Sequence, residues 1–95
     1  MRVVRKLKVK DSEVVLEVSP EQAFWVHDGP TVKSLKELSN AIAEMSPEQF
    51  AYHTMRNGND FARWIRDVLQ NSECANKIEM AENQKETLKV ISKYL

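Results

Sequence analysis

Apolar residues recur every three to four positions between residues 59 and 70, and no other stretch of the chain repeats so regularly. Polar residues fill the positions between them. Asn59 is a good helix N-cap, and Asp60 suits the positive end of the helix dipole. The pattern predicts an amphipathic helix that buries one apolar stripe against the rest of the protein. The stripe consists of Phe61, Trp64, Ile65, Val68 and Leu69.

The N-terminal part alternates apolar and polar residues in the way that β-strands do. Residues 2–9 and 13–18 are rich in valine, and Lys10-Asp11-Ser12 between them is typical of a turn. This predicts a β-hairpin within residues 1–19. A lone hairpin is marginally stable in water, so we expect it to pack on helices, gain a third strand or pair with another chain. Phe24 to His27 is a candidate for a third short strand.

The tetrapeptide Ser-Pro-Glu-Gln occurs twice, at residues 19–22 and 46–49. Both copies have the capping-box arrangement, in which a serine side chain and a glutamine side chain bond the first turn of a helix. The first copy predicts only a short turn, because Phe24-Trp25-Val26 favours extended backbone and Asp28-Gly29-Pro30 stops an element. The second copy predicts the start of a short helix.

Further start and stop signals divide the remaining chain into helices. Ser34 opens a helix to about Met45, and Asn57-Gly58 is a strong stop before the amphipathic helix. Ser72 is the expected N-cap of a last helical tract, whose middle at 79–86 has few large apolar residues and suggests a kink or a frayed segment. The sequence therefore predicts a mainly helical α+β fold, with the hairpin packed on a bundle of about four helices at 20–95.

Length and composition place the chain among ordinary globular proteins. Its 95 residues, 42% hydrophobic and 29% charged, fit a single domain spanning 1–95. A lone cysteine, Cys74, excludes an internal disulfide and a cysteine-based zinc site, and this fits a reducing compartment. No segment has the roughly 20 apolar residues that a membrane span needs. We therefore expect a cytoplasmic protein without a membrane segment.

The net charge is zero, but the charges are unevenly placed. Residues 1–10 hold five basic residues and no acid, whereas residues 11–50 hold eight acids against two lysines. The simpler interpretation is a solvated strand face beside compensating acids. The alternative is a small strip that faces a phosphate or another anion.

Few side chains offer metal or nucleophilic chemistry, and the candidates are His27, Asp28, His53 and Cys74. No two of them have the spacing of metal ligands on one helix, and the chain has no glycine-rich phosphate loop. We therefore expect no metal, no cofactor and no catalytic residue. An exposed Trp25 would be an anchor for a partner, because tryptophan is common at the centre of interfaces.

The stop at Asn57-Gly58 reverses the chain between two predicted helices. This geometry can bring His53 back beside Asp60, and a carboxylate at close range favours the charged imidazole. We expect the pair to act as a clamp that fixes the angle between the helices. His53, Asn59, Asp60 and Arg63 form a candidate cluster whose role is structural or ligand-binding.

One motif resembles an uncharacterised family of small archaeal and bacterial domains. The motif is His53, five residues, Asn59-Asp60-Phe61-Ala62, one residue, and Trp64-Ile65, and the resemblance covers about residues 20–80. Cys74 departs from the leucine expected there. The resemblance implies a shared fold and no particular activity.

We expect a small non-enzymatic interaction or regulatory module, bound to a protein partner or to itself as a homodimer through the hairpin or Trp25. A nucleic-acid-binding protein that uses the basic strand Arg2 to Lys10 together with Arg56, Arg63 and Arg66 is an alternative, although such domains are usually clearly basic. An enzyme with His53 and Asp60 as an acid–base pair is a second alternative, but no third group or nucleophile accompanies them.

Overall fold

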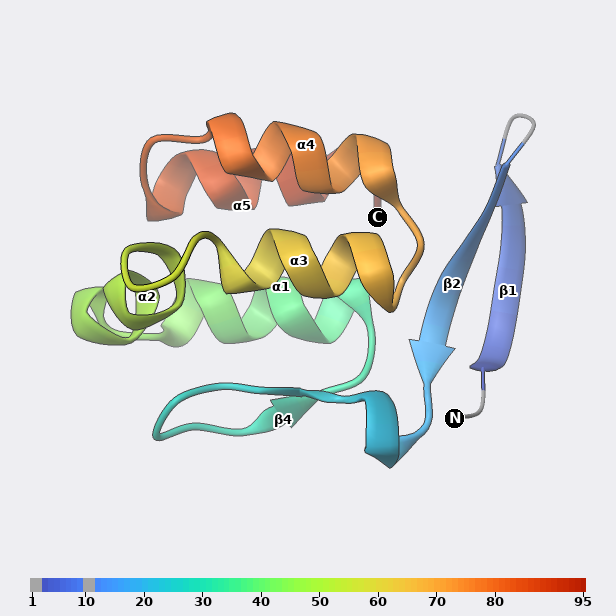
Figure 1. The fold of residues 1–95 in the computed structure, drawn as a ribbon, viewed down its shortest axis with the longest axis horizontal. Helices are drawn as coiled ribbons and strands as arrows, with labels where there is room; N and C mark the ends of the chain where they lie inside the picture. The colour runs from blue at the N-terminus through green and yellow to red at the C-terminus, as the bar shows by residue number, and fades with distance from the viewer. Residues whose placement is uncertain (1–2, 10–11) are drawn as a thin grey trace.

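The computed structural model describes residues 3–9 and 12–95, with side chains from Glu17 onward. It confirms a mainly helical α+β fold (Figure 1). In chain order the elements are β1 (Val3–Val9), β2 (Ser12–Val18), the 3-10 turn η1 (Pro20–Gln22), β3 (Phe24–Trp25), β4 (Thr31–Val32), α1 (Leu35–Glu44), α2 (Pro47–Thr54), α3 (Asp60–Asp67), α4 (Ser72–Met80) and α5 (Gln84–Ser92). No helix in the described ranges is long and apolar enough to cross a membrane.

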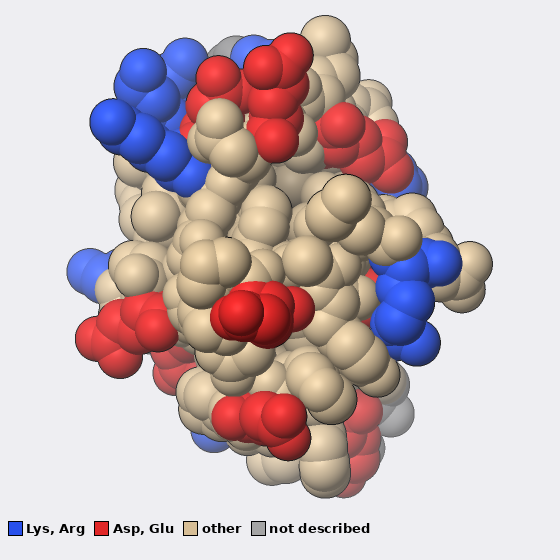
Figure 2. All heavy atoms as spheres, turned by 90° about the vertical axis from the view of Figure 1, so that its left-hand side faces the viewer, with Lys and Arg blue, Asp and Glu red and all other residues tan. Residues whose placement is uncertain are grey.

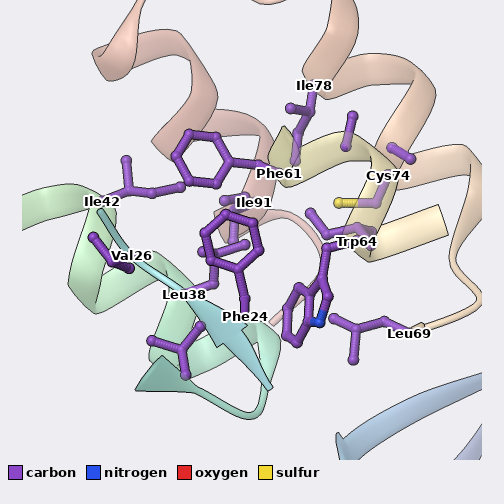
Figure 3. Packing of buried hydrophobic residues seen from close by; sticks show 14 of the residues in the cluster. Phe24, Val26, Leu38, Ile42, Phe61, Trp64, Leu69, Cys74, Ile78 and Ile91 are labelled. Atoms are coloured by element: carbon purple, nitrogen blue, oxygen red, sulfur yellow. The ribbon is translucent and has the colours of Figure 1, made fainter. Parts of the chain in front are cut away.

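Helix α3 lies at the centre of the helical part, as its sequence pattern predicts. It packs along α4 and contacts α2, while α1 packs along α5. Asn59 caps α3 by accepting a hydrogen bond from the N–H of Ala62 at 3.0 Å. The side chains of Phe61, Trp64, Ile65 and Leu69 are buried in a core shared with α1, α4, α5 and β3, which Figure 3 shows from close by.

The predicted N-terminal hairpin is present as an antiparallel pair of β1 and β2. Its expected turn residues Lys10 and Asp11 lie outside the described residues. Figure 1 shows the hairpin beside the helices with β1 on its outer side. Val18, at the end of β2, is buried in the core and donates its N–H to the carbonyl of Lys33 at 3.0 Å.

The expected third strand is a strand, but it belongs to a different sheet. β3 pairs antiparallel with β4, with Phe24 opposite Val32 and Trp25 opposite Thr31. The residues between them form a tight turn in which Asp28 adopts a left-handed conformation with φ of 57°. This turn makes a second short hairpin, so β3 does not extend the sheet of β1 and β2.

The two Ser-Pro-Glu-Gln copies fold differently. At α2 the full capping box forms, with the N–H of Gln49 donating to Ser46 Oγ at 3.1 Å and the N–H of Ser46 donating to Gln49 Oε1 at 2.8 Å. The first copy forms only η1, and Ser19 makes no side-chain cap. The prediction of a short turn there is confirmed, and the prediction of a capping box is wrong, because the next residues enter β3.

The last helical tract is two helices, so the described residues hold five helices where about four were expected. The break at 81–83 falls in the tract with few large apolar residues. Asn83 caps α5 by accepting the N–H of Glu86 at 2.8 Å, which favours a new helix start. The N-cap of α4 is Asn71, which accepts the N–H of Cys74, and the expected cap Ser72 is the first helical residue.

Candidate functional site

His53 lies in the last turn of α2, and both of its ring nitrogens are hydrogen-bonded. Nδ1 is 3.0 Å from Asp60 Oδ2, and Nε2 accepts the backbone N–H of His27 at 3.0 Å. A nitrogen that accepts a hydrogen bond carries no proton, so Nδ1 holds the proton and donates to Asp60. The ring is therefore the neutral Nδ1–H tautomer. The expectation of a charged imidazole is wrong, because the N–H of His27 occupies the second nitrogen.

The His53 ring is buried among aromatic side chains from three elements. The residue is 4% exposed, and the ring centroid lies 5.0 Å from Phe24 on β3, 5.1 Å from Phe61 on α3 and 5.1 Å from Tyr52 on α2. Aromatic rings at such spacings attract each other beyond their shared burial. His53 thus joins the β3–β4 hairpin, α2 and α3 at one point.

The predicted cluster of His53, Asn59, Asp60 and Arg63 comes together at the start of α3. Asp60 uses one carboxylate oxygen for His53 and the other for Arg63 Nη1, which lies 2.8 Å from Oδ1. Arg63 also donates to the carbonyl of Asn57 at 2.5 Å, which holds the loop before α3. The Asn59 side chain is used for capping. In this geometry the cluster fixes the junction of α2 and α3.

A stack of three planar groups lies on the outer side of His53. The rings of His27 and Tyr52 are parallel within 8° at 3.8 Å, and the guanidinium of Arg56 lies 3.9 Å above the Tyr52 ring. Sequence reasoning missed this stack. The spacing of Tyr52 and Arg56 at i and i+4 was the available signal, because such residues are neighbours on a helix. His27 reaches Tyr52 only through the turn after β3.

A shallow groove of about 470 Å³ runs beside this stack. We call it the Trp25 groove, after the exposed tryptophan that lines it. Trp25 is 74% exposed, whereas its neighbour Phe24 is 8% exposed, because the two side chains alternate across β3. Its other lining residues include Tyr52, Arg56, Asp60, Arg63, Asp67 and Val68. The position of Trp25, which the sequence left undecided, is therefore an exposed one.

The described side chains contain neither a cluster suited to a metal ion nor a reactive cysteine. Among them no group of three His, Cys, Asp or Glu residues is placed to hold a metal ion. Cys74 is fully buried, and burial raises the pKa of its thiol to about 12. The thiolate is the reactive form, so this cysteine is inert near neutral pH.

The arginines that were considered for a nucleic-acid surface are engaged within the protein. Arg56 lies on Tyr52, Arg63 pairs with Asp60, and Arg66 Nη2 lies 3.0 Å from Glu79 Oε1 and 2.9 Å from Asn76 Oδ1. Of the basic N-terminal strip, Arg2 and Lys10 lie outside the described residues. We therefore keep nucleic-acid binding as the less favoured alternative.

Comparisons with protein-family models, curated proteins and solved structures found no match to this chain. The resemblance carried by the motif at 53–65 therefore stays a prediction. The function has to be argued from the geometry of the site.

Proposed function

We propose that this chain is a non-enzymatic protein-interaction module that docks a partner on the Trp25 groove. The observation that carries the proposal is the 74% exposure of Trp25, a large aromatic side chain at the surface of a small protein. Tryptophan, tyrosine and arginine dominate the binding energy of interfaces. Trp25, Tyr52, Arg56 and Arg63 all line the same groove.

The backbone that carries Trp25 is held from several directions. Phe24 is buried and pairs with Val32, so β3 is anchored on its inner side. The N–H of His27 donates to His53, and the carbonyl of His27 accepts from Gln49 Nε2 at 2.8 Å. A preorganised anchor loses little freedom on binding, which favours affinity.

The lining indicates the class of partner. Arg56 and Arg63 are balanced by Asp60 and Asp67 in the same groove, so the groove has no strong net charge. A protein segment that presents an apolar side chain against Trp25, with polar backbone groups toward the charged rim, fits this surface. A highly charged partner such as nucleic acid fits it less well.

The geometry of His53 supports binding over catalysis. An acid–base residue needs a ring nitrogen within reach of a substrate. Both nitrogens of His53 are bonded inside the protein, and the residue is 4% exposed. We therefore assign His53 and Asp60 to support of the groove.

Peptide display gives a direct test of the proposal. A peptide library is selected on the wild-type protein and counter-selected on Trp25→Ala. We expect the selected peptides to share a motif that contains a hydrophobic residue. A synthetic peptide with this motif should shift the amide NMR signals of the residues that line the groove. The variant Met80→Ala serves as the control, because Met80 is also exposed, at 79%, but does not line the groove. Selected peptides that bind wild type and Trp25→Ala equally would contradict the proposal.

A further inference from the structure

The Trp25 groove presents one unpaired charge of each sign. Asp60 and Arg63 in its lining neutralise each other through an ion pair at 2.8 Å. Arg56 and Asp67 also line it, and neither forms an ion pair with a side chain in the described part of the protein. Figure 2 shows acidic and basic side chains together on one largely uncharged face, so no field of a single sign covers that face. Recognition of a charged partner therefore depends on individual side chains.

Arg56 is oriented to bind a carboxylate. The face of its guanidinium lies 3.9 Å from the Tyr52 ring, and its Nε donates to the carbonyl of Tyr52 at 3.3 Å. The ring of His27 is stacked on Tyr52 at 3.8 Å and supports it. These contacts use the face and Nε of the guanidinium, so Nη1 and Nη2 keep their donors within the described structure. Two neighbouring N–H groups of this kind match the two oxygens of a carboxylate.

Asp67 is placed to bind a cation. It is the exposed last residue of α3, and its carboxylate makes no hydrogen bond within the described part of the chain. The C-terminal end of a helix carries partial negative charge, so an acid at this position is unfavourable until a cation lies near it. A lysine or arginine of a partner would interact favourably with both the carboxylate and the helix end.

The two unpaired charges lie at different ends of α3. Arg63 donates to Asp60 at the start of α3 and to the carbonyl of Asn57, the neighbour of Arg56 in the chain. Arg56 is therefore held near the start of α3, whereas Asp67 is its last residue. At 1.5 Å per residue the helix separates its two ends by roughly 10 Å. An extended segment, which rises about 3.3 Å per residue, covers this length in about three residues.

We propose that the Trp25 groove recognises an extended segment of a partner protein with an acidic and a basic residue about three positions apart. The acidic residue pairs with Arg56 and the basic residue pairs with Asp67, while an apolar residue beside them packs on Trp25. This recognition rests on the proposed docking of a partner in the groove, and it adds a direction to that docking. The reversed segment would bring like charges together, and such contacts disfavour the wrong arrangement.

Peptides selected on the wild type and lost on Trp25→Ala give the first test. We expect them to share an acidic and a basic residue with this spacing. Isothermal titration against the wild-type protein then measures such a peptide and two versions of it, in which either charged residue is replaced by glutamine. Each replacement should weaken binding by about tenfold, because one charge pair is lost. These measurements do not depend on the folding of a protein variant.

Charge exchange between protein and peptide gives the second test. Arg56→Glu should bind the selected peptide at least about tenfold more weakly, and a peptide with lysine in place of its acidic residue should restore binding. Asp67→Lys should lose affinity in the same way and regain it with a peptide whose basic residue is replaced by glutamate. The matched controls are Lys36→Glu and Glu44→Lys, because both residues are exposed but do not line the groove. Both controls should bind the original peptide like the wild type.

The outcomes separate this proposal from the proposed function. Peptides whose binding depends on Trp25 but on neither of their charged residues overturn the charge recognition and leave the groove as the docking face. Charge exchanges that lose affinity without regaining it overturn the charge recognition as well. Selected peptides that bind Trp25→Ala as tightly as the wild type overturn both proposals.

Discussion

Histidine is a common catalytic acid or base, but His53 is placed to hold parts of this fold together. Its imidazole donates to Asp60 and accepts from the N–H of His27, so each nitrogen has one fixed role. Removing either partner leaves a buried polar group unsatisfied, and this costs more than the net value of the hydrogen bond. The side chain therefore holds the β3–β4 hairpin against the junction of α2 and α3.

A double-mutant cycle tests this clamp. We expect His53→Ala and Asp60→Ala each to lower the free energy of unfolding by roughly 1–3 kcal/mol. The double variant should cost less than the sum of the two, because the shared hydrogen bond is lost only once. Urea unfolding measures all three, with the exposed Asp67→Ala as the control. Additive costs would show that the two side chains do not interact. Nitrogen chemical shifts of His53 should also report the neutral Nδ1–H tautomer.

Cys74 provides a second prediction at this scale. Burial raises the pKa of its thiol from 9.0 to about 12, so the native protein should react with Ellman's reagent only through unfolding. We expect slow labelling in buffer and rapid labelling in denaturant. The raised pKa also means that the thiol's contribution to stability is complete below about pH 9 and falls as the pH rises toward 12. Rapid stoichiometric labelling of the native protein would contradict the buried placement.

At the scale of elements, the two Ser-Pro-Glu-Gln copies show how far a local motif decides structure. Ser46 caps α2 in a complete capping box, whereas the side-chain oxygen of Ser19 is buried without a hydrogen-bond partner in the described structure. The same four residues therefore form a complete capping box in one place and only a short uncapped turn in the other. The difference comes from the neighbouring segments, because the chain after Gln49 continues α2 whereas the chain after Gln22 enters β3.

Serine-to-alanine substitutions at the two copies form a matched pair. We expect Ser46→Ala to destabilise the protein by about 0.5–2 kcal/mol, because α2 loses its N-cap. Ser19→Ala should be neutral or slightly stabilising, because it removes a buried hydroxyl that has no partner in the described structure. Thermal or urea unfolding of both variants checks the prediction. Equal losses at the two positions would mean that Ser19 also caps its turn.

The elements were predictable where local residues decide them. The stripe of α3, the caps Asn59 and Ser46, and the hairpin of β1 and β2 follow from spacing and capping chemistry within a few residues. The contact of His53 with Asp60 was predictable because a single reversing turn separates them. The bond from His27 to His53 joins residues 26 positions apart, and no local pattern contains it.

Which side chain of β3 faces the core could not be predicted from the sequence either. Phe24 and Trp25 are adjacent aromatic residues, and either one could have faced inward. Pairing with β4 and contact of Phe24 with Phe61 and Trp64 decide that Phe24 is buried and Trp25 is exposed. The groove depends on this choice, so its location could be found only from the fold.

At the scale of the whole molecule, the short β3–β4 hairpin and α2 and α3 together present Trp25 on a supported surface. The two tryptophans have different roles. Trp64 is 8% exposed and donates its indole N–H to the carbonyl of Gln22 at 2.8 Å, so it belongs to the core. Trp25 contributes little buried area, and its side chain is accessible to a partner.

The most direct measurement compares stability and binding in Trp25→Ala. Because Trp25 is largely exposed, we expect its unfolding free energy to stay within about 0.5 kcal/mol of the wild type. By contrast, Trp64→Ala should cost roughly 3–5 kcal/mol. Isothermal titration of a peptide selected on the wild type should show a loss of affinity of at least about tenfold in Trp25→Ala, because hot-spot anchors cost about 2 kcal/mol or more when truncated. Unchanged affinity in a stably folded Trp25→Ala variant would contradict the assignment of this groove as the docking face.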